Sequence, residues 1–266
     1  MSPTSPARAG IVLGTRIHST HHSREVDLGG LVEWCEAANR LCHVVLLAVD
    51  TENLAAVRAH VGHLAPAVEI LHVTPWDGYC APLNSLLARA ARLGAGHLLL
   101  RSMEIDIGGA DVEELYRFAT PEALVVGARL EETHGGPPGD RPIDGLSSPW
   151  NTLALWNVET LSLTGFLAVS DGLFEPDSAG VEEVVVISLL QALHPGRARA
   201  LLIELPSVSW NARWADTHRR ARHEAKMRSK VDRGEIQLRS LNVPRGTVTV
   251  VARARVLEPV SEDAAR

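Results

Sequence analysis

Short apolar runs alternate with helical patterns along the first half of the chain. The runs are nearly continuous, as in strands buried on both faces, and the segments between them repeat apolar residues every three or four positions. Strands are predicted at Gly10–Thr15, Cys42–Asp50, Val68–Val73 and Gly96–Arg101. Helices are predicted between them at Leu28–Leu41, Thr51–Val61 and Ala81–Leu93. This alternation, with its short connections, predicts a layered α/β sheet.

The pattern is less regular in the second half of the chain. Asp111 followed by Glu114 has the spacing of a capping box and predicts a helix over Asp111–Phe118. Four glycines and three prolines among polar residues predict a mobile loop over Glu131–Ser148. Further strands are expected at Ala123–Leu130, Thr152–Leu155, Leu163–Val169, Ala200–Leu205 and Gly246–Val256, and helices at Ser178–Leu193 and Asp216–Arg233.

Composition adds exclusions rather than a function. The 266 residues are 45% hydrophobic and 22% charged, which is typical of a globular protein, and no apolar run approaches the roughly 20 residues of a membrane helix. A formal net charge of -6 argues against a nucleic-acid partner. The three cysteines have no metal-type spacing, so we expect reduced, buried thiols in a cytoplasmic protein.

The sharpest chemical feature is the acidic turn Glu104-Ile105-Asp106, directly after the predicted strand Gly96–Arg101. In open α/β sheets, ligands bind beyond the carboxyl ends of the strands. Two carboxylates one residue apart at such an end can both reach one hard divalent cation, which in turn can bridge two phosphate oxygens. The alternative is an acidic turn that is simply solvated.

The stretch Leu83–Asp106, LNSLLARAARLGAGHLLLRSMEID, resembles the core of family 2-type glycosyltransferases with the GT-A fold. In that family a helix with an asparagine, here Asn84, leads through a Gly-Ala turn and an apolar strand into a DxD motif. The motif holds the metal and the diphosphate of the donor, and Glu104 and Asp106 match its two acidic positions. The resemblance therefore implies Mg²⁺ or Mn²⁺ as cofactor and a nucleotide-sugar as substrate.

Two further stretches extend the resemblance, which spans roughly residues 10–214. Val44–Val57 is similar to the family's second strand, whose terminal acid contacts the nucleoside of the donor; Asp50 matches that acid, but the usual Ser/Thr-Asp-Gly after it is missing. Leu163–Leu193 resembles the acceptor side, where Glu182 and Glu183 occupy the place of an acidic xED-type motif.

In inverting members of the family, the acid of this motif is the general base that deprotonates the acceptor hydroxyl. Glu183 matches the final acid of the motif and is preferred over Glu182. A carboxylate in the first turn of a helix is stabilised by the helix dipole and can stay ionised for that task. The alternative is that the two acids only stabilise the helix N-terminus.

Basic residues are concentrated in the segment Arg213–Arg233. Of the 26 basic residues of the chain only Lys226 and Lys230 are lysines, so the abundance of arginine carries no functional weight and position decides. A diphosphate could offset the like charges of this helix, with Arg219 and Arg222 among its contacts. By resemblance to many GT-A enzymes, His218 or His223 could supply a late metal ligand. A solvated helix face explains the same residues.

Two aromatic–polar pairs follow predicted strand or loop ends, Trp76-Asp77 and Trp150-Asn151. Sugars stack on aromatic faces and hydrogen-bond to amides and acids, so both pairs are candidate donor or acceptor contacts. Core packing of the tryptophans is the alternative.

Together these features predict one GT-A-like, Rossmann-like α/β domain, with a mixed, mostly parallel sheet flanked by helices and followed by a basic helix and C-terminal extension. Residues 1–110 would form the donor-binding half, residues 111–215 the acceptor and catalytic half, and residues 216–266 the basic helix and extension. The expected activity is metal-dependent transfer of a sugar from a nucleotide-sugar to a small-molecule or glycan acceptor. The apolar strand Gly246–Val256 could also pair with a second copy of the chain.

Two other functions fit the same sequence. Leu13-Gly14-Thr15-Arg16 partly matches the phosphate-binding opening of sugar-phosphate nucleotidyltransferases, whose fold is related, although the preceding glycines are absent and no lysine precedes Lys226. A non-catalytic GT-A-like domain that binds a nucleotide or serves as a scaffold would explain the missing Ser/Thr-Asp-Gly. The retained set of Glu104, Asp106 and Glu183 favours an enzyme.

Overall fold

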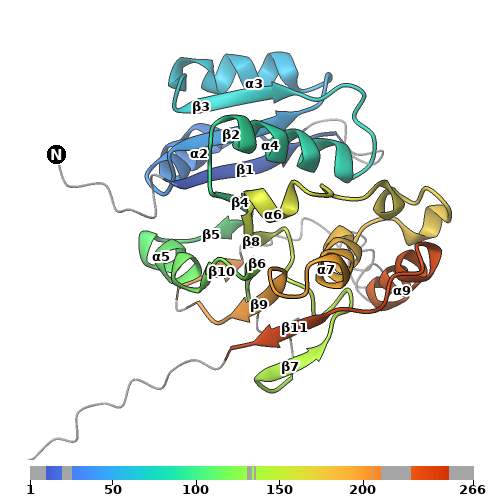
Figure 1. Ribbon diagram of the computed structural model, residues 1–266. Helices are drawn as coiled ribbons and strands as arrows, with labels where there is room; N and C mark the ends of the chain where they lie inside the picture. The colour runs from blue at the N-terminus through green and yellow to red at the C-terminus, as the bar shows by residue number, and fades with distance from the viewer. Residues whose placement is uncertain are drawn as a thin grey trace, which may run out of the picture.

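The computed structural model describes residues 10–19, 26–130, 134, 136–205, 207–210 and 229–251. Within these residues a nine-stranded sheet lies between two layers of helices (Figure 1). The strand order is β3-β2-β1-β4-β8-β6-β9-β11-β7. These strands are β1 (Ile11–Ile17), β2 (Val44–Val49), β3 (Val68–His72), β4 (His97–Arg101), β6 (Ala123–Ala128), β7 (Gly139–Pro142), β8 (Leu153–Asn157), β9 (Arg199–Ile203) and β11 (Thr247–Val250). A separate two-stranded ribbon pairs β5 (Ile105–Asp106) with β10 (Ser209–Trp210).

Most neighbouring strands of the large sheet run parallel. β1 pairs in parallel with β2 and β4, β2 with β3, and β9 with β6 and β11. β8 runs antiparallel between β4 and β6, and β7 runs antiparallel along β11. The predicted α/β class with a mixed, mostly parallel sheet is therefore confirmed.

Helices cover both faces of the sheet because both alternating sets of side chains along the central strands are apolar. In β4, Leu98 and Leu100 belong to one core and Leu99 to the other. All six residues of β2 are buried. The first core packs on α4 (Cys80–Arg92), α6 (Val158–Leu161), α7 (Glu182–Leu193) and α9 (Lys230–Ser240), and the second on α2 (Leu31–Asn39), α3 (Leu54–Val61) and α5 (Gly109–Phe118).

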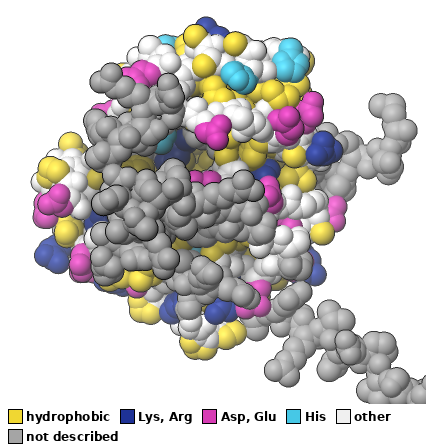
Figure 2. Space-filling model, turned by 180° about the vertical axis from the view of Figure 1, so that it is seen from behind, with side chains coloured by type: hydrophobic (Ala, Val, Ile, Leu, Met, Phe, Trp, Pro, Cys, Tyr) yellow, Lys and Arg dark blue, Asp and Glu magenta, His cyan; other side chains and the backbone are white. Residues whose placement is uncertain are grey.

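The charged side chains, the cysteines and the helix lengths can be compared with what the composition predicts. Figure 2 shows acidic and basic side chains interspersed on the described part of one face. Cys35, Cys42 and Cys80 are buried thiols that lie outside any disulfide. Among the described residues, no helix is both long and apolar enough to cross a bilayer.

The strands and helices predicted in the first half of the chain are confirmed, with ends that shift by a few residues. One correction concerns α5, which begins at Gly109, before the predicted start at Asp111. The Oδ2 atom of Asp111 accepts a hydrogen bond from the Gly108 N–H at 2.9 Å, so the acid closes the first turn from inside the helix.

The prediction of a mobile loop over Glu131–Ser148 is wrong in part, because Gly139–Pro142 forms β7 at the edge of the sheet. Its glycine and proline disfavour a strand, but pairing with β11 supplies the hydrogen bonds. Proline is tolerated at a sheet edge. The partner strand is more than a hundred residues away, so local sequence carries no signal of this pairing.

The predicted strand Leu163–Val169 is also wrong, because this stretch turns and enters the 3₁₀ helix Ala168–Asp171. Gly165 has a φ of 64°, and the side chain of Asn84 bonds the backbone of Phe166 in place of a neighbouring strand. The helix predicted from Ser178 begins at Glu182, since Gly180 and Val181 both have positive φ.

The last described residues, 229–251, are part of the same body. β11 extends the main sheet beside β9, and α9 packs against α7. Most of the predicted basic helix Asp216–Arg233 lies outside the described residues, as does the end of the predicted strand Gly246–Val256.

His134 is fully buried and is held on both ring nitrogens. Its Nδ1 atom accepts a hydrogen bond from the Leu130 N–H at 3.0 Å, and Nε2 lies 3.0 Å from the Ser148 carbonyl oxygen. The ring packs on Trp150 with the centroids 4.5 Å apart. Burial lowers the pKa of His134 to about 4, so the imidazole stays neutral in the folded protein.

The pKa of His134 rises to its ordinary value of 6.5 on unfolding. Its contribution to stability is therefore complete above pH 6.5 and is lost as the pH falls toward 4, with a loss of roughly 2 kcal/mol by pH 5. His134→Gln should weaken this acid-side loss, whereas His72→Gln, at an exposed histidine, should leave it unchanged. Urea unfolding of the three proteins at pH 5 and 7 measures the difference. Equal pH dependence in the parent and His134→Gln would contradict the assignment.

Candidate functional site

A cavity of about 270 Å³ opens at the carboxyl ends of β1 and β4, and we call it the strand-end cavity. It is lined by residues 14–16 and 18 at the end of β1, by residues 100–104 at and after the end of β4, by residues 151 and 152 before β8, and by Leu83 of α4. β2 and β3 lie on one side of β1 and β4 lies on the other, so the strand order reverses here. Such a switch point is where open α/β sheets bind ligands.

The acidic turn lies at the edge of this cavity. Ile105 is buried between two exposed acids; Glu104 lines the cavity, and the side chain of Asp106 is 66% exposed. Asp106, two residues after Glu104 in the sequence, lies in β5 and does not line the cavity.

Arg101 fixes the acidic turn from below the surface. Its Nε donates to the Ile105 carbonyl at 2.8 Å, and its Nη2 lies 3.6 Å from Asp106 Oδ1. The guanidinium carbon is 4.9 Å from the centroid of the Trp34 ring, and Arg101 is only 3% exposed. A buried cation thus sets the position of the second acid of the motif.

The donor set fits a divalent cation only with help from a ligand. Among the described residues no three His, Cys, Asp or Glu side chains come together as a metal site. Glu104 and Asp106 could hold a cation jointly with phosphate oxygens, because hard divalent ions take oxygen ligands from protein and substrate together. The predicted metal ligands His218 and His223 and the predicted diphosphate contacts Arg219 and Arg222 lie outside the described residues.

Glu182 and Glu183, the first residues of α7, form a buried acid pair joined by Asn151. The backbone N–H of Asn151 donates to Glu183 Oε1 at 2.7 Å, and its Nδ2 donates to Glu182 Oε1 at 3.1 Å. The Trp156 indole N–H donates to Asn151 Oδ1 at 2.9 Å, which fixes the orientation of the amide. Asn151 itself lines the cavity, so it connects the acid pair to the cavity wall.

The surroundings of the pair raise the proton affinity of Glu183. Each acid is 5% exposed, and Arg16 Nη1 lies 3.7 Å from Glu182 Oε1. Burial, and next the charge of Glu182, raise the pKa of Glu183 to about 7. Glu183 can therefore exchange a proton near neutral pH, which is what a general base or acid requires.

Two other predicted residues bind the protein's own backbone. Asp50 accepts from the Ser19 N–H at 2.7 Å and from the Asn53 N–H at 2.8 Å, and so ties the loop after β1 to the end of β2. The Nδ2 of Asn84 donates to the Phe166 carbonyl at 2.9 Å, and its Oδ1 accepts from the Phe166 N–H at 2.8 Å.

Trp76 does not line the cavity itself but contacts His18, which does. It stacks on His18 with the centroids 4.9 Å apart and the planes 16° from parallel, and His18 lines the cavity. Asp77 is exposed beside Trp76.

The structure therefore brings Glu104 and the partners of the acid pair to one cavity. Asp50, just after β2, and Asn84, within α4, instead bond the backbone of neighbouring loops. Arg16 was predicted only within the alternative phosphate-binding opening Leu13-Gly14-Thr15-Arg16. Two further wall residues, His18 and Arg101, were not predicted as site residues. Their only sequence signal is position, since each lies at or just after the end of a buried strand.

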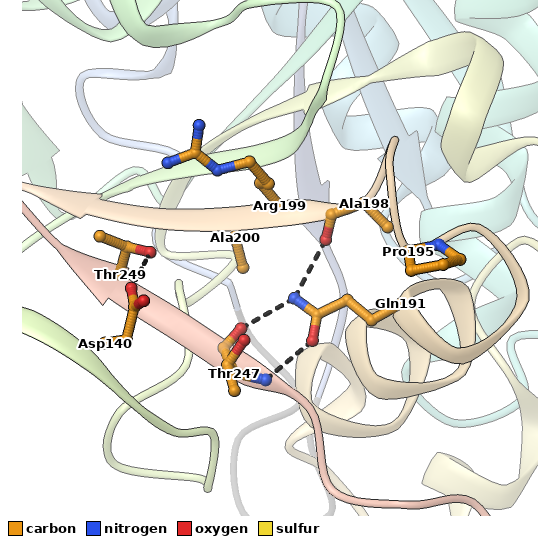
Figure 3. Close-up of a pocket in the computed structure, with 8 residues that line it drawn as sticks. All are labelled: Asp140, Gln191, Pro195, Ala198, Arg199, Ala200, Thr247 and Thr249. Atoms are coloured by element: carbon orange, nitrogen blue, oxygen red, sulfur yellow. Dashed lines mark hydrogen bonds between the residues drawn. The ribbon is translucent and has the colours of Figure 1, made fainter.

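A second hollow of about 300 Å³ shares no lining residue with the strand-end cavity and lies between β7, β9, β11 and the end of α7 (Figure 3). Its polar groups bond one another. Gln191 donates to the carbonyls of Ala198 and Thr247 and accepts from the Thr247 N–H, and Thr249 donates to Asp140. This pairing suits a structural corner rather than a ligand site.

Strand order, helix layers and the cavity at the switch point together define a GT-A-like, Rossmann-like fold. No protein-family model matches the chain, and no curated protein matches it in sequence.

Solved structures share the fold. One is a mannosyltransferase from Pyrobaculum calidifontis in complex with GDP-Man and Mn²⁺, with 16% identity and a TM-score of 0.53 over 85% of this chain. The match covers 65% of the mannosyltransferase, so this chain spans less than two thirds of its length. Another is a 4-diphosphocytidyl-2C-methyl-D-erythritol synthase from Anaerococcus prevotii, with 8% identity and a TM-score of 0.51 over 83% of this chain and 99% of that one. At such identities the likeness establishes the fold.

Replacing Arg101 by methionine removes the hydrogen bond to Ile105 and the contact with Asp106. We expect a loss of about 2 kcal/mol in the free energy of unfolding and faster hydrogen exchange at the Ile105 amide. Arg92→Met, at an exposed arginine of α4, is the matched control. Urea unfolding and exchange followed by NMR measure both effects. Equal results for the two variants would show that Arg101 does not hold the turn.

Proposed function

We propose that this chain transfers a sugar from a nucleotide-sugar donor to the hydroxyl of a small-molecule or glycan acceptor, with Mg²⁺ or Mn²⁺ bound at the acidic turn. The observation that carries the proposal is the strand-end cavity, whose wall contains both Glu104 and Asn151, the residue that holds the acid pair. Glu104, on the proposed diphosphate side, and Asn151, the donor to the proposed base, thus border one space at the switch point of the sheet.

The acidic turn supplies the diphosphate side. Glu104 and Asp106 would hold the cation together with phosphate oxygens, and when bound the cation neutralises charge on the departing diphosphate. Arg101 fixes the turn, so the carboxylates need little reorganisation. Arg219, Arg222 and one of His218 or His223 complete the proposed contacts on this side.

The acid pair supplies the base. The Glu183 carboxylate accepts the proton of the acceptor hydroxyl as that oxygen bonds the anomeric carbon and the bond from that carbon to the diphosphate oxygen breaks. Glu182 raises the proton affinity of Glu183, and Arg16 offsets the charge of Glu182. Trp76 and Asp77, behind His18, and Asp50 and Asn84, through the loops that they bind, are proposed to shape the nucleoside and sugar positions.

A sugar-phosphate nucleotidyltransferase is the second candidate. Arg16, the last residue of Leu13-Gly14-Thr15-Arg16, lies on the cavity wall, where it could contact a phosphate. The distinguishing product is a nucleotide-sugar formed from a nucleoside triphosphate and a sugar phosphate. A scaffold would bind nucleotide without either turnover.

Nucleotide binding provides the first test of the function. A nucleoside diphosphate in large excess over its Kd should stabilise the folded state by about 3 kcal/mol in Mn²⁺ and by less in EDTA. Glu104→Gln should remove most of the Mn²⁺-dependent part, whereas Glu113→Gln, at an exposed acid of α5, should not. Thermal unfolding with a panel of nucleotides reads this out. Absence of any response would contradict both enzyme candidates.

Turnover tests the base. Glu183→Gln should lower kcat for sugar transfer by about 10²–10⁴-fold without weakening nucleotide binding, because the amide keeps the bond from Asn151 but accepts no proton. In the parent, kcat should rise with pH as Glu183 deprotonates near pH 7. Glu175→Gln, at an exposed acid before α7, is the control. A parent-like rate for Glu183→Gln would exclude Glu183 as the base.

A further inference from the structure

Three consecutive backbone carbonyls just before the acid pair are all bound by side chains of α9. Gln237 Nε2 donates to the carbonyls of Ser178 and Gly180, each at 2.6 Å. Arg233 Nη1 donates to the Ala179 carbonyl at 2.7 Å. The two side chains are four residues apart and so share one face of the helix.

These contacts are buried. Gln237 is 0% exposed, and its Oε1 accepts a hydrogen bond from the hydroxyl of Ser170 at 3.2 Å. Gly234, between the two donors, lets α9 approach α7 closely, because a Cβ there would lie 3.2 Å from Val184. Arg233 is also buried. Shape and hydrogen bonding thus seat α9 on the start of α7.

The backbone that α9 holds has an unusual conformation. Gly180 has a φ of 92°, and Val181, a β-branched residue, has a φ of 56°. Left-handed backbone at such a residue persists only where the surrounding structure enforces it. Glu182 and Glu183 follow immediately as the first residues of α7. The turn therefore determines where the helix begins and the position of both carboxylates.

α9 also reaches the other side of the pair. Lys230 Nζ lies 3.1 Å from the centroid of the Trp150 ring, and Trp150 precedes Asn151, the donor to both acids. Lys230 is three residues before Arg233 and so belongs to the same face of the helix.

We propose that α9 positions the acid pair, with Gln237 and Arg233 as positioning residues that keep Glu183 buried beside Asn151. The catalytic meaning of this arrangement rests on the proposed function, but the arrangement itself does not. It makes residues from the C-terminal part of the chain necessary to an acid pair whose bonds to Asn151 and Arg16 come from earlier residues.

The charged and titratable groups around Glu183 come from several elements. Glu182 is adjacent, Lys230 and Arg233 face the pair from α9, Arg16 pairs with Glu182 from β1, and Cys80 of α4 lies within electrostatic reach of Glu182. Gln237 is uncharged, so its replacement changes the position of the pair without removing a charge. Since burial is the largest cause of the raised pKa of Glu183, release of the turn toward water should lower that pKa.

The test measures the proton affinity of Glu183 without any substrate. Glu183→Gln is made in the parent and in Gln237→Leu, and the free energy of unfolding is measured in urea from pH 5 to 8. In the parent background, the stability of the Glu183→Gln protein relative to the glutamate protein should increase as the pH rises toward 7. In the Gln237→Leu background, that pH-dependent difference should fall to half or less.

Ser240→Ala, at an exposed position of α9, is the control and should leave the difference unchanged. Arg233→Lys keeps the charge with a different donor geometry, and it provides the same test if Gln237→Leu does not fold. An unchanged pH-dependent difference in the folded positioning variant would overturn the proposal, even if that variant were less stable at every pH.

Activity separates this inference from the proposed function. With sugar transfer in the parent, Gln237→Leu should lower kcat at least tenfold, leave the KM for the donor within twofold and move the pH profile to lower pH. Transfer by Gln237→Leu with an unchanged pH profile would overturn the positioning role alone. A shifted pH-dependent stability difference without transfer by the parent would support the positioning role and contradict the proposed function.

Discussion

Burial of the central strands on both faces is the constraint on which the rest of this structure depends. β2 is buried along its whole length, and β1 and β4 contribute apolar side chains to both cores. Polar side chains that can contact a ligand are therefore found where these strands end, as at Arg16 and Arg101. Because the order of the strands reverses between β1 and β4, their ends open into a cavity instead of being covered by a crossing connection.

This constraint explains how far the sequence predicts the fold. The first half was predictable because buried parallel strands and amphipathic helices are local patterns, visible in Cys42–Asp50 and Ala81–Leu93 alone. The failures lie where a distant partner decides. β7 exists because β11 pairs with it, and the turn at Phe166 exists because Asn84 bonds its backbone. Neither partner can be inferred from the residues of the segment itself.

The candidate site, like the fold, has a part that local sequence predicts and a part that depends on distant residues. The acidic turn and the Glu182–Glu183 pair could be found from short motifs, because residue type and spacing carry that signal. The contacts that give these acids their properties could not, since Asn151 is far from the pair in sequence and Arg101 acts through a backbone carbonyl. A motif specifies which groups are present, whereas the protein's own hydrogen bonds decide which of them a ligand can reach. Asp50 illustrates this limit, because its carboxylate is bonded to the Ser19 and Asn53 backbone.

Residues 148–151 join two buried groups whose titrations oppose each other. His134 bonds the Ser148 carbonyl and packs on Trp150, while Asn151 bonds Glu183. Burial lowers the pKa of His134 to about 4 and raises that of Glu183 to about 7. Between pH 4.5 and 6.5, the folded state gains stability from His134 as the pH rises and loses it from Glu183, so the two contributions partly cancel. Each shift is a cost of burial, but the two costs apply at different pH. The cost of His134 is present at acid pH, where the unfolded chain binds a proton that the folded protein excludes, and that of Glu183 develops toward the neutral pH where the base must act. Near neutral pH the imidazole of His134 is uncharged, so it supports Trp150 and the Ser148 carbonyl without placing a further charge near the pair.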